Sequence, residues 1–366
     1  MSALVVTGAG VASVAGLGLA ALAGWLGTAV APPPVAGLYP DDLPYPYAPA
    51  FVGFDVRACL GRKGTSFLDR ATALAVVACG QAIEHSGLVL DEHARTRTGI
   101  ALGTTVGSLR SSSEYSRETL VADRPYLVNP VFFPNTVMNC AAGQAAIRYG
   151  LQGVNSTVAA GRLGFLGALR YAANALRRGY ADVMLTGAVE EFTPQRAWWH
   201  RHSGAPGLPG EAAAVFVLER ESTAVAAGRA PLAEVLAMAS GYHPGGDPDG
   251  LSGRVAACMA GVLAEAALDP GQLDAVAVAE DGPDDRRIGD EAVAAVAGGR
   301  PVRRVGVRDR LGDCGAAAGA LQFAAILAGR GPEAAAGPVL LAGWTPEGGF
   351  AAAVIRSCAS AGPHRG

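Results

Sequence analysis

The distribution of hydrophobic and polar residues predicts an α/β protein. Short Val-rich apolar runs alternate with Ala-rich stretches whose apolar residues recur at helical spacing, a pattern typical of helices layered on sheets. In the first half, the predicted strands are residues 3–7, 99–105, 156–160, 182–187 and 213–218. The predicted helices there are residues 16–25, 67–86, 135–149 and 164–178. Residues 32–49 are expected to form a Pro/Tyr-rich loop, and residues 109–120 a polar helix or loop.

The second half repeats this alternation. Its predicted strands are residues 275–279, 302–307, 338–342 and 351–355, and its predicted helices are residues 252–267, 290–296 and 315–328. Because a chain of 366 residues exceeds what one core usually serves, we predict a duplicated architecture that divides near residue 235. The expected parts are residues 1–235, residues 236–357 and a flexible tail at 358–366. The Gly/Pro-rich residues 244–253 are expected to form an exposed connection.

Composition argues against several functional classes. The net charge of −3 gives no basic excess for nucleic-acid binding. The six cysteines show no CxxC and no metal-ligand spacing, so we expect reduced thiols and no metal site. The first 30 residues carry no charged side chain, but they lack the basic start of a signal peptide and a run of about 20 apolar residues. We therefore expect a cytoplasmic protein without a membrane segment.

Four motifs resemble those of β-ketoacyl synthases. Residues 129–191 match the family's central stretch, which contains an interface strand, a nucleophile elbow and its helix, and RRGYADVM at 177–184 matches the end of that helix. Three further matches are VVTGAGVAS at 5–13, GEAAAVFVLE at 210–219 and GDCGAAAGALQ at 312–322. The resemblance covers nearly the whole chain. It implies a thiolase-like fold, in which duplicated βαβ-rich halves form a layered α-β-α-β-α sandwich.

The resemblance also indicates that the catalytic residues are missing. The family's nucleophilic Cys falls on Arg162, or on Gly161 after a one-residue shift. An arginine stays protonated and is no nucleophile. The region of the first catalytic His, residues 279–292, contains acids and no His; the second His corresponds to Asp313, and the family's Lys to Arg308. If Arg162 is buried, it needs a counter-charge, for which Glu190, Asp313 and the acids of residues 280–285 are the candidates.

A ketosynthase-like chain without these residues resembles the chain length factor, or ketosynthase β-subunit, of type II polyketide synthases. That family typically shows Gln where this chain has Arg162. The resemblance implies a heterodimer with an active ketosynthase α-subunit, to which an acyl carrier protein presents a phosphopantetheine-bound acyl chain. No cofactor of the chain's own is expected. The product is expected to be a polyketide, either poly-keto or reduced and polyene-like.

The resemblance places two sets of residues at the expected interface. The strand that pairs with the partner contains Ser156, Thr157, Val158, Ala159 and Ala160. The residues expected to line the acyl tunnel and to limit chain length are Ser111, Ser112, Ser113, Ser116, Phe133 and Cys140. The serines are small and would leave room for a long chain, but they fit the solvated face of a surface helix equally well. Phe133, with its neighbour Phe132, is expected to form an apolar gate or ordinary core.

Two alternative functions remain open. Cys314 lies near a predicted helix N-terminus, so a decarboxylase or acyltransferase with a relocated nucleophile is one alternative. A ketosynthase homologue that binds acyl groups outside polyketide synthesis is the other. His200 and His202, beside two tryptophans, form either a functional pair or part of a surface loop, and we favour the loop.

Overall fold

The computed structural model describes residues 3–245, 247–278, 282–329 and 337–358. Eleven strands form one continuous mixed sheet in the order β4-β3-β5-β6-β1-β7-β11-β10-β8-β9, and β2 pairs with β1. The strands are β1 (Leu4–Ser13), β2 (Gly16–Leu17), β3 (Thr98–Thr104), β4 (Asn155–Ala159), β5 (Val183–Glu190), β6 (Ala212–Arg220), β7 (Ala233–Tyr242), β8 (Ala275–Val278), β9 (Arg303–Arg304), β10 (Pro338–Trp344) and β11 (Gly349–Ser357).

Thirteen α-helices and four short 3₁₀ helices are assigned in the described residues. The α-helices are α1 (Gly18–Leu26), α2 (Val56–Leu60), α3 (Arg70–Ser86), α4 (Glu92–Arg97), α5 (Leu109–Val121), α6 (Cys140–Tyr149), α7 (Gly164–Arg177), α8 (Pro194–His202), α9 (Glu221–Ala226), α10 (Pro248–Glu265), α11 (Pro283–Ala297), α12 (Arg308–Leu311) and α13 (Ala318–Ala328). The 3₁₀ helices are η1 (Pro130–Thr136), η2 (Gly161–Leu163), η3 (Pro270–Gln272) and η4 (Gly315–Ala317).

The two halves of the sheet have the same topology. In the first half, β3 pairs in parallel with β4 and β5, and β6 pairs antiparallel with β5 and β1. In the second half, β8 pairs in parallel with β9 and β10, and β11 pairs antiparallel with β10 and β7. Each half also places a helix between its last parallel strands, α7 in the first and α13 in the second. This correspondence confirms the duplicated α/β fold.

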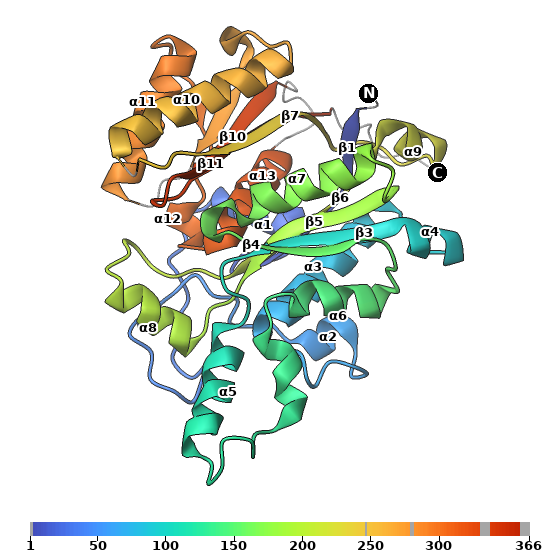
Figure 1. Ribbon diagram of the computed structural model, residues 1–366, viewed down its shortest axis with the longest axis vertical. Helices are drawn as coiled ribbons and strands as arrows, with labels where there is room; N and C mark the ends of the chain where they lie inside the picture. The colour runs from blue at the N-terminus through green and yellow to red at the C-terminus, as the bar shows by residue number, and fades with distance from the viewer. Residues whose placement is uncertain (1–2, 246, 279–281, 330–336, 359–366) are drawn as a thin grey trace.

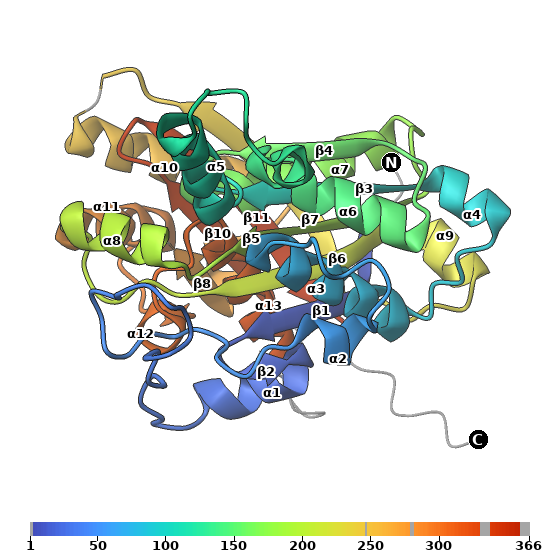
Figure 2. The same cartoon turned by 90° about the horizontal axis from the view of Figure 1, so that it is seen from below.

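The helices and half-sheets stack in five layers (Figures 1 and 2). From top to bottom, Figure 1 shows α10 and α11, the second half-sheet, α7 and α13, the first half-sheet, and finally α3 and α6. Three hydrophobic clusters fill the spaces between the layers. One surrounds α7 and α13, one lies between the first half-sheet and helices α3 and α6, and one lies between the second half-sheet and helices α10 and α11. The middle cluster draws on both half-sheets, so the expected α-β-α-β-α sandwich is confirmed.

Antiparallel pairing of β1 with β7 joins the half-sheets, through three residue pairs at Leu4–Val6. Residue 235, where we placed the division between the halves, lies inside β7. The three-part division of the chain stays a prediction, and residues 359–366 of its tail lie outside the described residues.

Several predicted boundaries were wrong. The strand expected at 302–307 contains only Arg303–Arg304, because the following residues turn into α12. The helix expected at 135–149 begins at Cys140, since Pro130 and Pro134 hold the preceding segment as the 3₁₀ helix η1. The connection expected at 244–253 ends at Asp247, whose side chain caps the first turn of α10. Strand β7 was not predicted, because the sequence near residue 235 was interpreted only as the division between the two halves.

Removal of the Phe216 side chain is expected to destabilise the fold strongly. Phe216 is fully buried, and its ring centroid lies 4.5 Å from that of Phe323 and 5.7 Å from that of Phe165. Phe216→Ala should lower the free energy of unfolding by about 3–5 kcal/mol, measured by denaturant titration. The control Leu120→Ala, at a position 84% exposed, should change it by less than about 0.5 kcal/mol. A loss below about 1 kcal/mol for Phe216→Ala would contradict the assigned middle layer.

Candidate functional site

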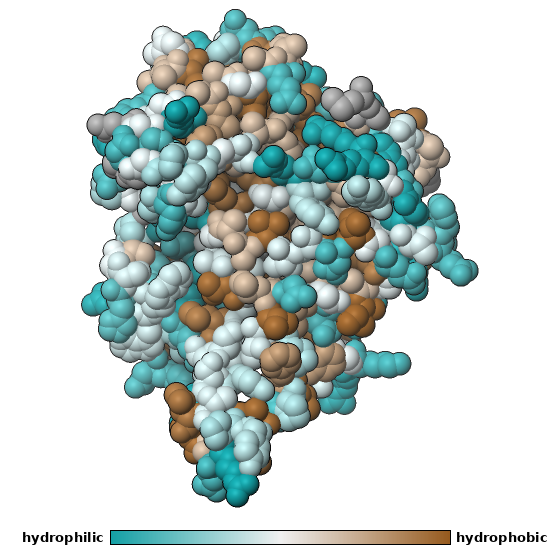
Figure 3. Space-filling model, in the orientation of Figure 1, coloured by the Kyte–Doolittle hydropathy of each residue, from teal (hydrophilic) through white to brown (hydrophobic). Residues whose placement is uncertain are grey.

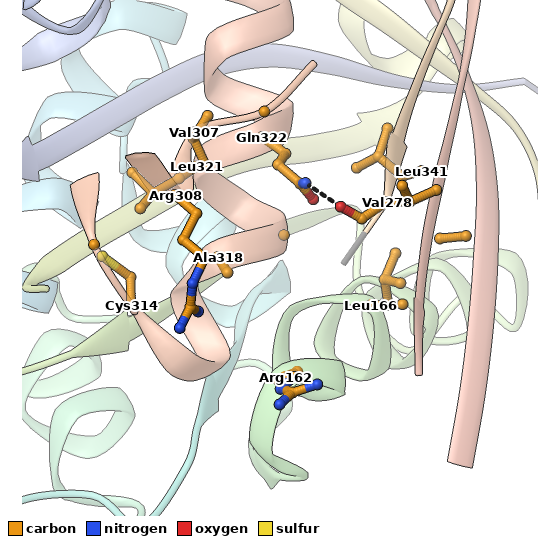
Figure 4. Close-up of a pocket in the computed structure, with 15 residues that line it drawn as sticks. Arg162, Leu166, Val278, Val307, Arg308, Cys314, Ala318, Leu321, Gln322 and Leu341 are labelled. Atoms are coloured by element: carbon orange, nitrogen blue, oxygen red, sulfur yellow. Dashed lines mark hydrogen bonds between the residues drawn. The ribbon is translucent and has the colours of Figure 1, made fainter. Parts of the chain in front are cut away.

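The tight turn between β4 and α7 positions Arg162. Gly161 adopts a left-handed φ of 50°, which glycine tolerates without strain, and η2 then leads into α7. At Gly103 of β3, an added Cβ would lie 2.3 Å from the carbonyl carbon of Gly164, so α7 begins directly against the sheet. Arg162 lies in the middle of this turn. Its side chain extends from the start of α7 into the space between the two halves (Figure 4).

Arg162 forms an ion pair with Asp285. Its Nη1 lies 2.7 Å from Oδ2 of Asp285, which is in the first turn of α11. The other carboxylate oxygen of Asp285 accepts a hydrogen bond from Nε1 of Trp344, at 2.9 Å. The side chains of Arg162 and Asp285 are 29% and 13% exposed. The sequence offered Glu190, Asp313 and the acids of residues 280–285 as candidate counter-charges, and the structure pairs Arg162 with Asp285 of the last group; Glu280 and Asp281 lie outside the described residues.

The space around Arg162 is small. A cavity of about 40 Å³ remains, lined by Arg162, Leu166, Cys314, Arg308 and Gln322 among others. A volume of this size holds a few water molecules at most. In Figure 4 the side chains of Arg162 and Arg308 extend into this space from opposite walls. An acyl group therefore has no room at the elbow in this arrangement.

Asp313 belongs to a buried polar network. Arg196 Nη1 lies 3.1 Å from Oε1 of Glu190, and its Nη2 donates to the carbonyl oxygen of Asp313 at 3.1 Å. The other oxygen of Glu190 accepts from Thr105 Oγ1 and from the amide of Ala316. Burial opposes the ionisation of Asp313, but Arg196, Arg308 and the Gly315 amide outweigh it and hold the pKa of this carboxyl below its usual value. Asp313 is thus a stabilised anion.

Arg308 begins α12. Its Nη2 donates to the carbonyl oxygen of Pro206 at 2.6 Å and lies 3.7 Å from Oδ2 of Asp313. The guanidinium therefore links α12 to the loop before β6. This contact fits a structural role for the side chain.

Cys314 lies beside this network but is not activated. It is 1% exposed, and its Sγ donates to the carbonyl oxygen of Leu311 at 3.2 Å. Burial, reinforced by the charge of Asp313, raises the pKa of its thiol far above the usual value. Because the thiolate is the nucleophile, a thiol held in the protonated form is inert.

His200 was assigned wrongly to a surface loop. It lies on α8 and is 4% exposed, while His202 on the same helix is exposed. Nδ1 of His200 lies 2.9 Å from the hydroxyl of Tyr45, and Nε2 lies 3.9 Å from Oδ2 of Asp313. Burial lowers the pKa of His200, so the ring is neutral near pH 7. The polar sequence of α8 gave no sign that one side of it is covered by the 32–50 loop.

Of the expected tunnel residues, Ser111 lines a larger cavity, of about 460 Å³, together with Phe132. Ser112 donates to the carbonyl oxygen of Thr136, at 3.3 Å, and so ties α5 to η1. Ser113, Ser116 and Phe133 do not belong to the lining of this cavity. Ser116 is exposed, as expected for the solvated side of a helix.

Phe132 and Phe133 are 47% and 53% exposed, so they are not ordinary core. The Phe133 ring packs against Tyr115, at a centroid distance of 5.9 Å. Cys140 is buried and donates to Oδ1 of Asn135 at 3.4 Å. It does not belong to the lining of the large cavity.

The large cavity is also lined by two acids that the sequence did not reveal, the half-buried Asp69 and the buried Glu191. Asp69 caps α3 by accepting from the amide and hydroxyl of Thr72. Glu191 is 1% exposed and accepts hydrogen bonds from Ser108 Oγ and from the amide of Arg110. The only sequence signal was two consecutive glutamates at the end of a core strand, which does not indicate where the second one points.

The predicted interface strand lies at an edge of the sheet. β4 pairs with β3 along one side and is the last strand in its half-sheet. Its residues are half-buried or exposed, in contrast with the fully buried β3 beside it. Of the five predicted residues, Ser156, Thr157, Val158 and Ala159 belong to β4, and Ala160 follows it.

Among the described residues, no cluster of three or more His, Cys, Asp or Glu side chains could hold a metal ion. The same residues contain no helix with the length and hydrophobicity needed to span a bilayer.

Comparison with known proteins identifies clear relatives. The model of the β-ketoacyl synthase N-terminal domain matches residues 54–224. The chain is 29% identical over 244 residues to 3-oxoacyl-[acyl-carrier-protein] synthase 2 of Vibrio cholerae, covering 58% of this chain and 58% of that enzyme. It is 26% identical over 303 residues to the Coxiella burnetii enzyme of the same name, covering 74% of this chain and 71% of that enzyme. The matched region thus spans little more than half of the Vibrio relative.

Solved structures match over the whole chain. The structure described as the ishigamide ketosynthase/chain length factor is 33% identical, with a TM-score of 0.81, and the match covers 97% of this chain and 99% of that one. A β-ketoacyl synthase from Burkholderia phymatum has a TM-score of 0.83 at 20% identity and covers 98% of this chain and 100% of that one. At that identity, the second match shows the fold alone.

Removal of the Asp285 charge tests the ion pair at the elbow. Asp285→Asn keeps an acceptor for Trp344 but removes the negative charge that lies 2.7 Å from Arg162 Nη1, so we expect a loss of about 1–3 kcal/mol in unfolding free energy. The matched control is Asp284→Asn, an exposed acid in the same helical turn, which shares any interaction with the helix dipole. Denaturant titration of both variants measures the difference, and equal stabilities would contradict the ion pair's role.

Proposed function

The chain belongs to the β-ketoacyl synthase family, and on that premise we propose that it is a non-catalytic chain length factor of a type II polyketide synthase. In this proposal it pairs with an active ketosynthase and limits the length of the polyketide, poly-keto or polyene-like, that the partner builds. The observation that carries the proposal is Arg162, which occupies the nucleophile elbow and is paired with Asp285.

The chemistry of the site supports a subunit without its own acyl transfer. A ketosynthase reaction needs a nucleophile that can accept an acyl group. Arg162 has no such atom, and the cavity of about 40 Å³ beside it is too small for an acyl chain. Asp313, at a His position, is an anion, which would oppose the negative charge that builds on oxygen during decarboxylative condensation.

A relocated nucleophile has little support in the structure. Cys314 is the cysteine nearest to the elbow among the described residues, and its thiol is buried with a raised pKa. The thiols of Cys79 and Cys140 are also buried, and burial raises their pKa values. None of these side chains has the lowered pKa that a catalytic thiol requires.

The surface around β4 favours a partner subunit. An edge strand presents unpaired backbone groups, and natural proteins usually cover or charge such an edge. Next to it, η1 packs on α6, which packs on β4. The lobe formed by α5 and residues 122–139 projects from the body in Figure 1, and Figure 3 shows hydrophobic residues on its flanks. Exposed apolar side chains on the lobe include Leu120, Val121, Tyr126, Leu127, Val131, Phe132 and Phe133.

An exposed apolar lobe of this extent marks an interaction site more often than a free surface. In the proposal, β4 pairs with the corresponding strand of an active ketosynthase, and the lobe covers part of the tunnel that starts at the partner's thiol. An acyl carrier protein delivers the phosphopantetheine-bound chain to that partner. The acyl-carrier-protein complex of a type II ketosynthase bound to a hexaketide matches with a TM-score of 0.79 at 17% identity, which supports the shared fold.

Chain length in this proposal is limited by steric contact. Ser111 and Phe132 line a cavity of about 460 Å³ that is deep enough to receive part of a chain. A bulky side chain at Ser111 would occupy this space. Overpacking by a few atoms costs about 1–3 kcal/mol, which corresponds to a bias of roughly five- to 150-fold against one more extension.

The test uses Ser111→Phe in a complex formed by co-expression with an active ketosynthase α-subunit. We expect a heterodimer by size-exclusion chromatography and shorter products by mass spectrometry. The matched control is Ser116→Phe, an exposed serine of the same helix outside the cavity lining, which should leave product length unchanged. Failure to form a heterodimer, or equal product lengths for both variants, would contradict the proposal.

A further inference from the structure

We propose that the cavity between α5, η1 and the start of α3 binds the part of an acyl ligand that carries a carbonyl oxygen, and that Ser111 donates the hydrogen bond at the end of a relay from Glu191. The inference deepens the proposed function and rests on it in one respect, that the ligand is an acyl chain. The sequence analysis considered these serines only for their small size. In this proposal Ser111 also acts as a hydrogen-bond donor.

The cavity has two chemically different walls. Phe54, Phe67 and Phe132 supply an apolar wall, while Ser108, Ser111 and Glu191 lie on the polar side. Glu114, whose side chain is 51% exposed, also belongs to the lining, so the cavity opens to the surface beside α5. A wall of this kind fits a ligand that is mostly hydrocarbon but carries a polar atom at one point.

Three side chains form a continuous hydrogen-bonded relay. Oγ of Ser108 lies 3.2 Å and 3.3 Å from the two carboxyl oxygens of Glu191 and 3.0 Å from Oγ of Ser111. Ser108 also accepts from the amide of Ser111, at 3.2 Å. Glu191 is almost fully buried, Ser108 is 4% exposed, and Ser111 is half-buried. The relay therefore runs from the protein interior to a hydroxyl that lines the cavity.

The protonation of Glu191 sets the direction of this relay. A hydroxyl has one proton to donate, and an ionised carboxylate only accepts. If Glu191 is ionised, Ser108 donates to it, Ser111 donates to Ser108, and Ser111 offers the cavity only lone pairs. If Glu191 is protonated, it donates to Ser108, Ser108 donates to Ser111, and the hydroxyl proton of Ser111 is available to a ligand.

The surroundings of Glu191 favour the protonated form near pH 7. Burial, followed by the negative charge of Asp69, raises its pKa to about 8, against the opposing hydrogen bonds from Arg110 N and Ser108. The other titratable or charged groups that act on Glu191 or belong to the same cavity are Tyr39, Asp55, Arg70, Arg110, Glu114 and Glu190.

The arginines of the cavity are engaged elsewhere. Arg70 makes two hydrogen bonds to Glu211, and Arg110 lies 2.7 Å from Glu114. Within the described residues, neither Asp69 nor Glu191 has an ion-pair partner. The ligand atom that complements a free hydroxyl proton is a neutral acceptor, for which a carbonyl oxygen is the natural choice in an acyl chain.

Isothermal titration calorimetry on the full-length chain tests the proposal. The probes are the pantetheine amide of octanoic acid and its 7-oxo derivative, which differ by one carbonyl oxygen and do not titrate. At pH 6.5 we expect the oxo probe to bind about three- to tenfold more tightly than the saturated probe, as one neutral hydrogen bond provides. At pH 9.5, above the pKa of Glu191 at about 8, this preference should disappear.

Three variants separate the relay from general effects on the cavity. Ser111→Ala should show no preference for the oxo probe at either pH. Glu191→Gln should keep the preference at both pH values, because the amide donates to Ser108 without titrating. Ser113→Ala, a neighbouring serine outside the lining, should behave like the unaltered chain.

Equal binding of the two probes at pH 6.5, absence of binding by both, or a preference retained in Ser111→Ala would overturn the proposal. The same holds if the unaltered chain still prefers the oxo probe at pH 9.5. Selective binding combined with unchanged product length in Ser111→Phe would refute the proposed function and leave the cavity assignment intact. Shorter products from Ser111→Phe without selective binding would do the reverse.

Discussion

An arginine in the turn before a buried helix must have a counter-charge, and much of the site follows from this constraint. The N-terminal end of α7 carries the positive end of the helix dipole, which favours an anion such as a thiolate and opposes a guanidinium. Asp285 offsets this cost by pairing with Arg162 at 2.7 Å, and Trp344 fixes the same carboxylate from β10. The pair joins an elbow of the first half to a helix of the second. The space that a reacting group would need is thereby occupied by protein side chains.

The layered fold and the charged groups at the elbow rest on partly separate residues. The hydrophobic clusters between the five layers do not include Arg162, Asp285 or Asp313. Leu166 and Cys314, which line the cavity beside Arg162, do belong to the middle cluster. The edge strand β4 and the apolar lobe around α5 belong to the surface rather than the core. The charged groups at the elbow and the exposed apolar surface are therefore carried by different parts of the fold.

Much of the fold was predictable, because buried strands such as β5 and β6 are continuous apolar runs and α7 has a clear helical period. The extent of β9 was mispredicted because the chain turns into α12, which a local pattern does not show. The 3₁₀ helix η1 was not predicted because the apolar period was read without the effect of Pro130 and Pro134. The counter-charge of Arg162 was predicted only as a group of acids. Which acid it is depends on where α11 begins relative to α7, and that is a long-range property of the fold.

The cavity beside α5 shows a different limit. The sequence indicated Ser111 as a candidate tunnel residue, from its position in the family resemblance and its small size. It did not indicate Glu191 or Asp69 as residues of a cavity. Each follows or precedes a core element, where a charged residue usually marks the boundary with solvent. Here the loop and the lobe cover these boundaries, so Glu191 is buried and Asp69 is half-buried. Only the tertiary arrangement reveals that three distant segments place polar groups around one space.

The account depends most on the claim that this chain forms no covalent bond with the acyl group. The direct measurement is intact-protein mass spectrometry of the co-purified heterodimer after incubation with an acylated carrier protein. The account predicts a mass increase of one acyl group on the partner ketosynthase and an unchanged mass for this chain. An acyl adduct on this chain that survives denaturation would contradict it.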